Sequence, residues 1–197
     1  MRHNPFEIVR MFEETVADYC GAPYAISTDN CTDALLICCE YLNVKEVTIP
    51  QRTYLSVPQS IMHAGGTVKF LDYRWKGVYQ LEPYPIWDAA KRLTSNMYIP
   101  GSFMCLSFHI KKHLKIGKGG MILTDNKEAV DWLKKARYEG RGVVKYHEDN
   151  IQINGYNAYM SPEMAARGLM LMQNYPEDVP DLPEEPWYRD LKEFDLF

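Results

Sequence analysis

The order of apolar and polar residues along the 197-residue chain predicts alternating helices and strands. Apolar side chains recur at every third or fourth position in 5–20 and 127–139, the pattern of amphipathic helices. Two more helices are expected over 56–64 and 161–172. Short apolar runs of the length of buried strands occupy 24–27, 46–49, 67–71, 85–87, 103–106 and 121–124. This alternation predicts an α/β fold, a three-layer sandwich with a mostly parallel sheet.

Several helix ends carry the residues that cap helices. Asn4 can cap the first helix, with Pro5 in its first turn, and Gly21 can end it. Asn30 can cap a further helix over 32–41, which is apolar almost all round and is therefore expected to be buried.

The end of the chain differs in composition from the rest. From residue 175 onward, prolines alternate with acidic residues, which is typical of an extended segment. We therefore predict one domain over 1–174 and an extended tail over 175–197. Three rings are expected to pack the tail down: Trp187, Tyr188 and Phe194.

The net charge and the cysteine content argue against several kinds of function. The net charge of −4 and a pI near 5.7 argue against a nucleic-acid partner, which usually binds a basic face. The five cysteines are odd in number and form no metal-type C-x-x-C pair, so we expect reduced thiols, no metal site and a cytoplasmic protein. Neither a leader nor a long apolar span is evident, so we expect no membrane association.

The segment 103–121 carries the strongest chemical signal. Its apolar run delivers Ser107 and Lys112 to the end of a strand, and the glycine-rich turn 117–120 sends the chain back as another strand. A lysine in such a place could form a Schiff base with a carbonyl if its pKa were lowered. On these residues alone, a basic surface loop is the more common explanation.

Ser-Phe-His-x-x-Lys followed by Gly-x-Gly-Gly resembles the lysine segment of the DegT/StrS-type sugar aminotransferases. These are pyridoxal-phosphate (PLP) enzymes of fold type I, so the resemblance implies their large-domain fold and PLP as the cofactor. It implies that Lys112 binds PLP covalently and moves the proton, and that Ser107 binds the phosphate. Lys111, one position away, is expected on the surface.

Residues 30–35 resemble the family's phosphate turn, Asn-Gly-Thr-x-Ala-Leu. The resemblance implies that the Thr32 hydroxyl and the Asp33 backbone N–H bind the phosphate, whereas the residues alone indicate only an Asn30 cap. Cys31 stands where glycine is usual, and it would strain the turn if a positive φ were required there.

Two further segments imply contacts to the cofactor ring. Residues 50–56 resemble the family's Pro-x-x-Thr-aromatic stretch, so Tyr54 would stack on the pyridine; a core tyrosine is the alternative. Trp87-Asp88-Ala89-Ala90 is similar to the family's Asp-Ala-Ala motif, so Asp88 would pair with the protonated pyridine nitrogen. Lys91 stands where many members have Gln or His facing the cofactor's phenolic oxygen.

Residues 147–160 are similar to the family's segment that reaches the neighbouring subunit. By this resemblance Asn157 contacts the phosphate of the other chain's cofactor, which implies a homodimer with shared active sites. Tyr159 replaces the usual arginine.

The chain also departs from the family in two places. The family has a further strand and helices between positions 72 and 87, where 73–86 are too few for a βαβ crossover. Soon after residue 172 the family continues into a second, smaller domain.

We therefore expect a PLP-dependent aminotransferase that acts on a keto-sugar nucleotide with glutamate as amino donor. The alternatives are a PLP-binding relative with little turnover that serves as a scaffold or partner of another protein, and a plain α/β interaction domain.

Overall fold

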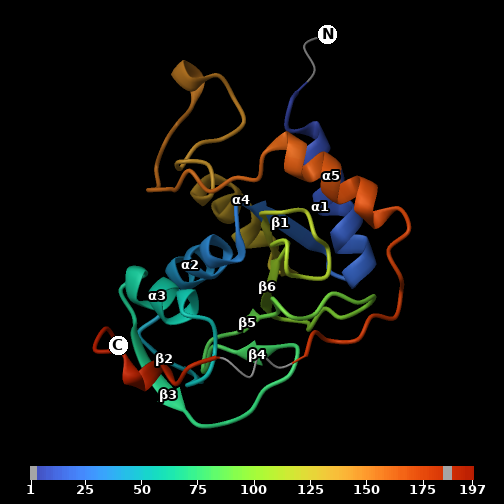
Figure 1. The fold of residues 1–197 in the computed structure, drawn as a ribbon. Helices are drawn as coiled ribbons and strands as arrows, with labels where there is room; N and C mark the ends of the chain where they lie inside the picture. Colours follow the sequence, from blue (N-terminus) through green and yellow to red (C-terminus); the bar gives the residue numbers. More distant parts are fainter. Residues whose placement is uncertain (1–3, 184–187) are drawn as a thin grey trace.

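The computed structural model describes residues 4–183 and 188–197 (Figure 1). The strands form two sheets, one of five strands and one of two. The two-stranded sheet is parallel and consists of β2 (Glu46–Pro50) and β3 (Thr67–Leu71). The five-stranded sheet has the order β1 (Tyr24–Thr28), β7 (Gly120–Thr124), β6 (Phe103–Ser107), β5 (Ile86–Asp88) and β4 (Tyr79–Gln80).

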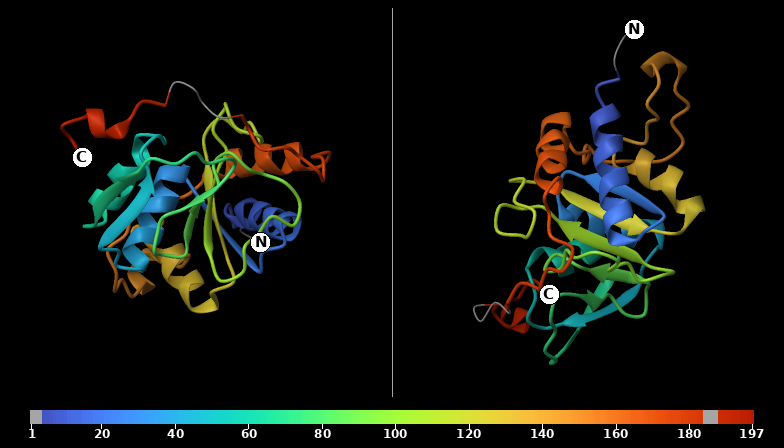
Figure 2. Two further views of the ribbon diagram at one scale, coloured as in Figure 1. Left: turned by 90° about the horizontal axis from the view of Figure 1, so that it is seen from below. Right: turned by 90° about the vertical axis from the view of Figure 1, so that its right-hand side faces the viewer.

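Helices cover both faces of the five-stranded sheet (Figures 1 and 2). One face packs against α1 (Glu7–Cys20) and α5 (Pro162–Met172). The other packs against α2 (Cys31–Tyr41) and α4 (Lys127–Ala136), with α3 (Ser56–His63) beside α2. Two 3-10 turns, η1 (Tyr146–Glu148) and η2 (Leu191–Glu193), complete the elements.

Strand β6 shows how the sequence builds these three layers. Phe103 and Cys105 face the α2 side, whereas Met104 and Leu106 face the α1 side, because alternate residues of a strand point to opposite faces. Since both faces are covered, the strand reads as an unbroken apolar run. The predicted three-layer α/β fold is confirmed.

The strand directions differ from the mostly parallel sheet that we predicted. Strands β5 and β6 are parallel, but β1–β7, β7–β6 and β4–β5 are antiparallel, so the five-stranded sheet is mixed. The glycine turn 117–120 returns the chain directly alongside β6, which makes β7 antiparallel. The sequence predicts the turn itself, but the alternation of helices and strands does not show which strand β7 pairs with.

The stretch 73–88 forms a hairpin, as its length requires. Tyr79 pairs with Asp88 and Gln80 with Trp87 in the β4–β5 ladder. Immediately after β4, Glu82 exchanges backbone hydrogen bonds of 2.8 and 3.1 Å with Thr48. This pair joins the β2–β3 sheet to the five-stranded sheet.

Two predicted helix ends need correction. Helix α1 begins at Glu7, not at Pro5, and Asn4 does not cap it: Phe6 is the N-cap residue, and Asn4 Oδ1, two residues earlier, accepts a 3.0 Å bond from Phe6 N. Gly21 does end the helix, with φ 73°. Helix α4 ends at Ala136 and not at 139, because Glu139 turns the chain with φ 58°.

The first part of the C-terminal segment lies across the ends of the central strands. Glu177 O accepts bonds of 2.9 Å from Ser95 N and from Thr94 Oγ1. Asp181 accepts two bonds of 2.7 Å from Arg92, so residues 176–183 are held extended against the loop after β5.

The last residues continue to the β2–β3 sheet. Leu191 is buried, and its N–H donates to Gln51 O over 2.9 Å. Tyr188 lies nearly parallel to Trp75, and Phe194 contacts Phe197; the expected packing of Trp187 falls outside the described residues. The domain boundary at 174 stays a prediction. No helix in the described ranges has the length and apolar character needed to cross a membrane.

Candidate active site

The ends of β5 and β6 and the start of α2 meet at one place. Asp88 is the last residue of β5 and pairs across the parallel ladder with Cys105. Ser107 ends β6 opposite Gly120, and a Cβ on Gly120 would lie 2.4 Å from Asn30 C and O. Strand ends and helix start are therefore in close contact, in the position where ligands bind in α/β folds.

Asp88 is a buried carboxylate, with 5% of its surface exposed. Its Oδ1 accepts a 2.9 Å bond from Ala90 N, and its Oδ2 accepts a 2.8 Å bond from Tyr79 OH. Burial raises the pKa of Asp88, although these two bonds and the charges of Lys112 and Lys91 act in the opposite direction. The anion is thus incompletely compensated, and a cationic partner would stabilise it.

Lys112 lies in the loop between β6 and β7. Phe108 N donates to Gly119 O over 2.8 Å, and Gly117 N donates to Phe108 O over 3.2 Å, which closes this loop. Lys112 is half-buried whereas Lys111 is exposed. Burial raises the pKa values of both Asp88 and Cys31, and the Lys112 charge partly opposes this rise in each, so its amine lies within electrostatic reach of both.

The start of α2 is capped as the sequence predicted. Asn30 Oδ1 accepts a 2.9 Å bond from Asp33 N, and Thr32 Oγ1 donates to Ser56 Oγ over 2.8 Å. The Asp33 N–H, which we expected to be available for phosphate, is therefore engaged by the cap. Cys31 is the first helical residue and is not among the residues with positive φ, so it does not strain the turn.

The other three expected ligands differ in exposure and in the partners that they contact. Tyr54 is 60% exposed, and no ring of the described residues stacks on it. Lys91 is buried and donates from Nζ to Pro183 O over 2.7 Å. Asn157 is exposed and donates from Nδ2 to Glu139 Oε1 over 3.1 Å.

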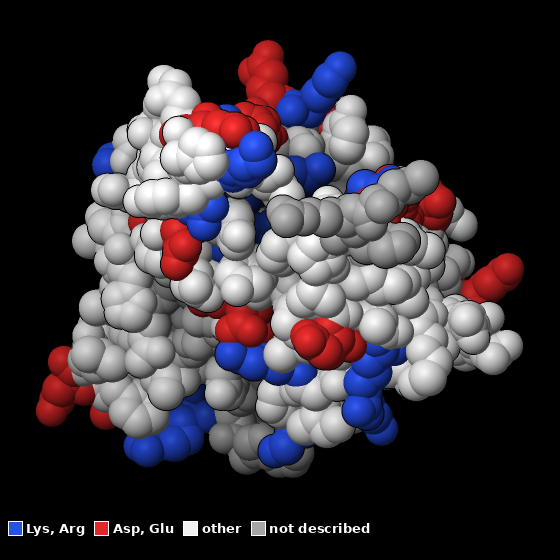
Figure 3. Space-filling model, turned by 90° about the horizontal axis from the view of Figure 1, so that it is seen from above, with Lys and Arg blue, Asp and Glu red and all other residues white. Residues whose placement is uncertain are grey.

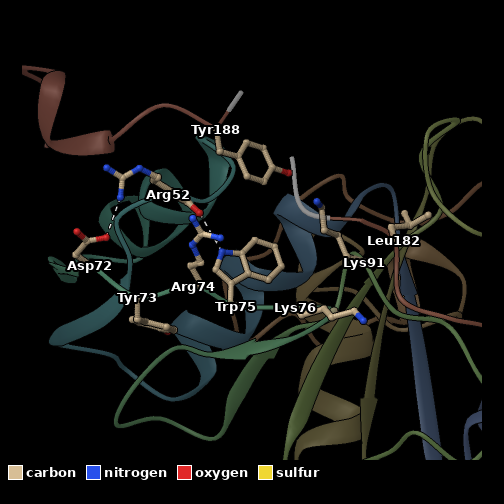
Figure 4. Close-up of a pocket in the computed structure, with 10 residues that line it drawn as sticks. Arg52, Asp72, Tyr73, Arg74, Trp75, Lys76, Lys91, Leu182 and Tyr188 are labelled. Carbon is tan, nitrogen blue, oxygen red and sulfur yellow. Dashed lines mark hydrogen bonds and ion pairs between the residues drawn. The ribbon is translucent and has the colours of Figure 1, made fainter. Parts of the chain in front are cut away.

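A cavity of about 630 Å³ opens beside Lys91 (Figure 4). Arg52 lies at one end, where it forms a 2.8 Å ion pair with Asp72. Basic and aromatic side chains predominate in its lining: Arg52, Arg74, Lys76, Lys91, Tyr73, Trp75 and Tyr188. The lining suits an anionic ligand that also presents a planar ring.

Sequence reasoning missed Tyr79. Its hydroxyl lies 2.6 Å from Thr53 Oγ1 as well as 2.8 Å from Asp88 Oδ2. The ring belongs to a two-residue strand, which is too short to show periodicity. The only local signal was the proline-containing turn that follows, Glu82-Pro83.

Comparison with known proteins decides the family. The model of the DegT/DnrJ/EryC1/StrS aminotransferase family matches residues 4–96 and 94–179. The chain belongs to this family. The family predicted from the sequence is thereby confirmed, and with it PLP as the family's cofactor.

Individual relatives are distant. A GDP-perosamine synthase from Caulobacter vibrioides is 24% identical, over 85% of this chain and 57% of its own length. A UDP-4-amino-4,6-dideoxy-N-acetyl-beta-L-altrosamine transaminase from Campylobacter jejuni is also 24% identical, over 82% and 55%. The chain therefore spans little more than half the length of these relatives.

Solved structures share the fold. The aminotransferase PseC from Helicobacter pylori, involved in the biosynthesis of pseudoaminic acid, superposes with a TM-score of 0.71 at 17% identity, covering 86% of this chain and 58% of PseC. AtS13 from Actinomadura melliaura gives a TM-score of 0.73 at 18% identity, covering 85% and 60%.

The donor set fits PLP. A buried carboxylate that lacks full compensation suits a protonated pyridine nitrogen, and a half-buried amine near it suits the aldehyde. Thr32 and Ser107 offer hydroxyls, and the first turn of α2 offers backbone donors for a phosphate. Among the described residues, no group of three His, Cys, Asp or Glu is placed to bind a metal.

Proposed function

We propose that this chain transfers an amino group to a keto-sugar nucleotide with PLP as cofactor and glutamate as donor. The observation that carries the proposal is the meeting of Asp88, Lys112 and the start of α2 at one edge of the sheet. Bound PLP supplies a protonated ring that stabilises negative charge on the amino acid's Cα.

The protein's residues then have distinct roles. The Lys112 amine attaches the cofactor covalently and carries the proton during transfer. Asp88 holds the proton on the pyridine nitrogen, because a buried anion favours a bound cation. Thr32 and Ser107 hold the phosphate with their hydroxyls.

The cavity beside Lys91 supports the substrate class. Arg52, Arg74 and Lys76 can meet a diphosphate, and the Trp75 ring offers a surface on which a base can stack. Both relatives reported above are named after a nucleoside diphosphate sugar or its aminated product.

A homodimer with shared sites is supported by the loop 139–160, which projects from the body of the fold (Figure 1). Val143, Val144 and Tyr146 on this loop are 66%, 53% and 70% exposed. Figure 3 views this side of the molecule, where charges of both signs surround uncharged surface. Such apolar exposure suits a contact with a second copy, which would bring Asn157 to the other chain's phosphate.

Sedimentation combined with PLP titration over a dilution series tests the dimer. PLP affinity should fall as the dimer dissociates. A monomer that binds PLP with undiminished affinity would refute the shared site.

The proposed location is the cytoplasm, because the five free thiols suit a reducing compartment.

Borohydride reduction tests the central assignment. We expect the purified protein with PLP to absorb visible light, and reduction followed by peptide mapping to find the cofactor on Lys112. Lys112→Ala should abolish this label, whereas the control Lys111→Ala should retain it, because Lys111 is exposed on the same loop. Label on Lys111 would overturn the assignment, and no label at all would leave an α/β interaction domain.

One observation favours the alternative of PLP binding with little turnover. Pro180 O lies 3.0 Å from His113 Nε2, next to Lys112, and Pro183 O accepts from Lys91, so residues 180–183 border the site. Adding glutamate to the PLP-bound protein separates the two proposals. Spectral conversion on the scale of seconds indicates transamination, and an unchanged spectrum indicates a binding protein.

A further inference from the structure

We propose that Tyr79 is a positioning residue that acts through Asp88, holding the carboxylate in one orientation and in its ionised form for the pyridine nitrogen. This inference rests on the proposed function, because it assigns Asp88 to the cofactor ring. Tyr79 comes from the hairpin that β4 and β5 form within residues 73–88.

The hydrogen-bond directions follow from counting protons. Ionised Asp88 can only accept, so the single phenolic proton of Tyr79 must point at Oδ2, 2.8 Å away. The Thr53 hydroxyl, 2.6 Å from the same phenol oxygen, must then donate to Tyr79. Thr53, Tyr79 and Asp88 thus form a chain of donors that ends on the carboxylate.

Burial makes this chain effective. Thr53 is 2% exposed, Tyr79 is 3% exposed and Asp88 is 5% exposed, so water does not compete for these bonds. Burial and the neighbouring Asp88 charge raise the pKa of Tyr79, which therefore remains a proton donor at neutral pH. The Trp75 ring covers Tyr79 with a centroid distance of 4.6 Å.

The backbone fixes the same geometry. Tyr79 and Asp88 are directly paired residues of the β4–β5 ladder, so their side chains leave the same face of the sheet. Ala90 N holds the other oxygen, Oδ1, over 2.9 Å. Removing the phenol hydroxyl would leave Asp88 free to rotate about its remaining bond and would favour its protonated form.

The test compares Tyr79→Phe with Tyr84→Phe. Tyr84 lies on the same hairpin, and its hydroxyl accepts from Lys45 N over 2.8 Å, without touching Asp88. In the cofactor-free protein, carbon-13 NMR titration of the Asp88 carboxyl should show a higher pKa in Tyr79→Phe and the wild-type pKa in Tyr84→Phe. Thr53→Val should give a smaller rise, since it removes only the second donor.

With PLP bound, the half-reaction with glutamate should slow about 10- to 100-fold in Tyr79→Phe, the loss expected for one hydrogen bond to a charged group. The acid limb of the pH–rate profile of Tyr79→Phe should move to higher pH, because Asp88 then protonates more readily.

An Asp88 pKa unchanged in Tyr79→Phe, or raised equally in Tyr84→Phe, would overturn the inference. If the NMR shift is found but wild-type protein takes up no PLP, the proposed function is wrong and the role of Tyr79 in cofactor chemistry falls with it. If PLP binds and the acid limb does not move, this inference alone is wrong.

Discussion

Substituting Gly120 with alanine should destabilise both the fold and the cofactor site. A Cβ at this position would lie 2.4 Å from Asn30 C and O and 2.6 Å from Cys31 N. Ordinary carbon contacts are about 3.5–4.0 Å, so the start of α2 must move by about 1 Å. The obstructing atoms are backbone, which cannot rotate away as a side chain can.

The expected cost follows from this overlap. Overpacking of a closed interior costs about 1–3 kcal/mol, which lowers the melting temperature of a chain of this size by roughly 2–12 °C. Because the displaced residues include the turn that presents Thr32, PLP affinity should fall as well. Urea unfolding and PLP titration by fluorescence measure the two effects.

Gly142→Ala provides the matched control. Its Cβ would have no neighbour closer than 3.6 Å, and its φ is not in the left-handed region. This variant should change stability by no more than about 0.5 kcal/mol. If Gly120→Ala unfolds at the wild-type urea concentration and binds PLP equally well, the packing of β7 against α2 is not as described.

Three further perturbations probe other parts of the molecule. Asp88→Asn should retain much of the PLP affinity, because the phosphate is held elsewhere, but slow the glutamate half-reaction by orders of magnitude; a normal rate would remove Asp88 from the site. Glu13→Ala should cost about 3–5 kcal/mol in urea unfolding, because the buried Glu13 pairs with Arg137, whereas Glu14→Ala on the surface should cost under about 1 kcal/mol; equal costs would contradict this. The Arg92 guanidinium lowers the pKa of Asp181, so this ion pair stabilises the tail at neutral pH and is lost only as the pH falls through that lowered pKa. Pepsin should therefore cleave within 176–183 only in strong acid, and cleavage already at pH 5 would refute this.

Local signals predicted much of the structure. The Asn30 cap, the glycine that ends α1 and the apolar run of β6 each depend on a few consecutive residues, and the structure contains all three. The family resemblance of their segments assigns Asp88 and Lys112 to one site, and the structure places the strands that precede them, β5 and β6, side by side.

The features that were missed depend on residues distant in sequence. Strand direction in the sheet is decided by which strands become neighbours, as when β7 inserts between β1 and β6. The role of Tyr79 depends on pairing with Asp88 across a hairpin that shows no periodicity. The course of the tail depends on long-range contacts such as the ion pair between Arg92 and Asp181, and nothing in either local sequence identifies the other.

The pair formed by Thr48 and Glu82 has a consequence for how the molecule opens. Within the described ranges it is the backbone ladder contact between the two sheets, so β2 and β3 can separate while the larger sheet keeps its own hydrogen bonds. Amide protons of this small sheet should therefore exchange with solvent sooner than those of β6 and β7. Thr53 follows β2 and Tyr79 belongs to the larger sheet, so their hydrogen bond also connects the two sheets. The hydrogen bonds from Thr53 to Tyr79 and from Tyr79 to Asp88 therefore both orient Asp88 and connect the two sheets. A change that breaks them should let the two sheets unfold less cooperatively.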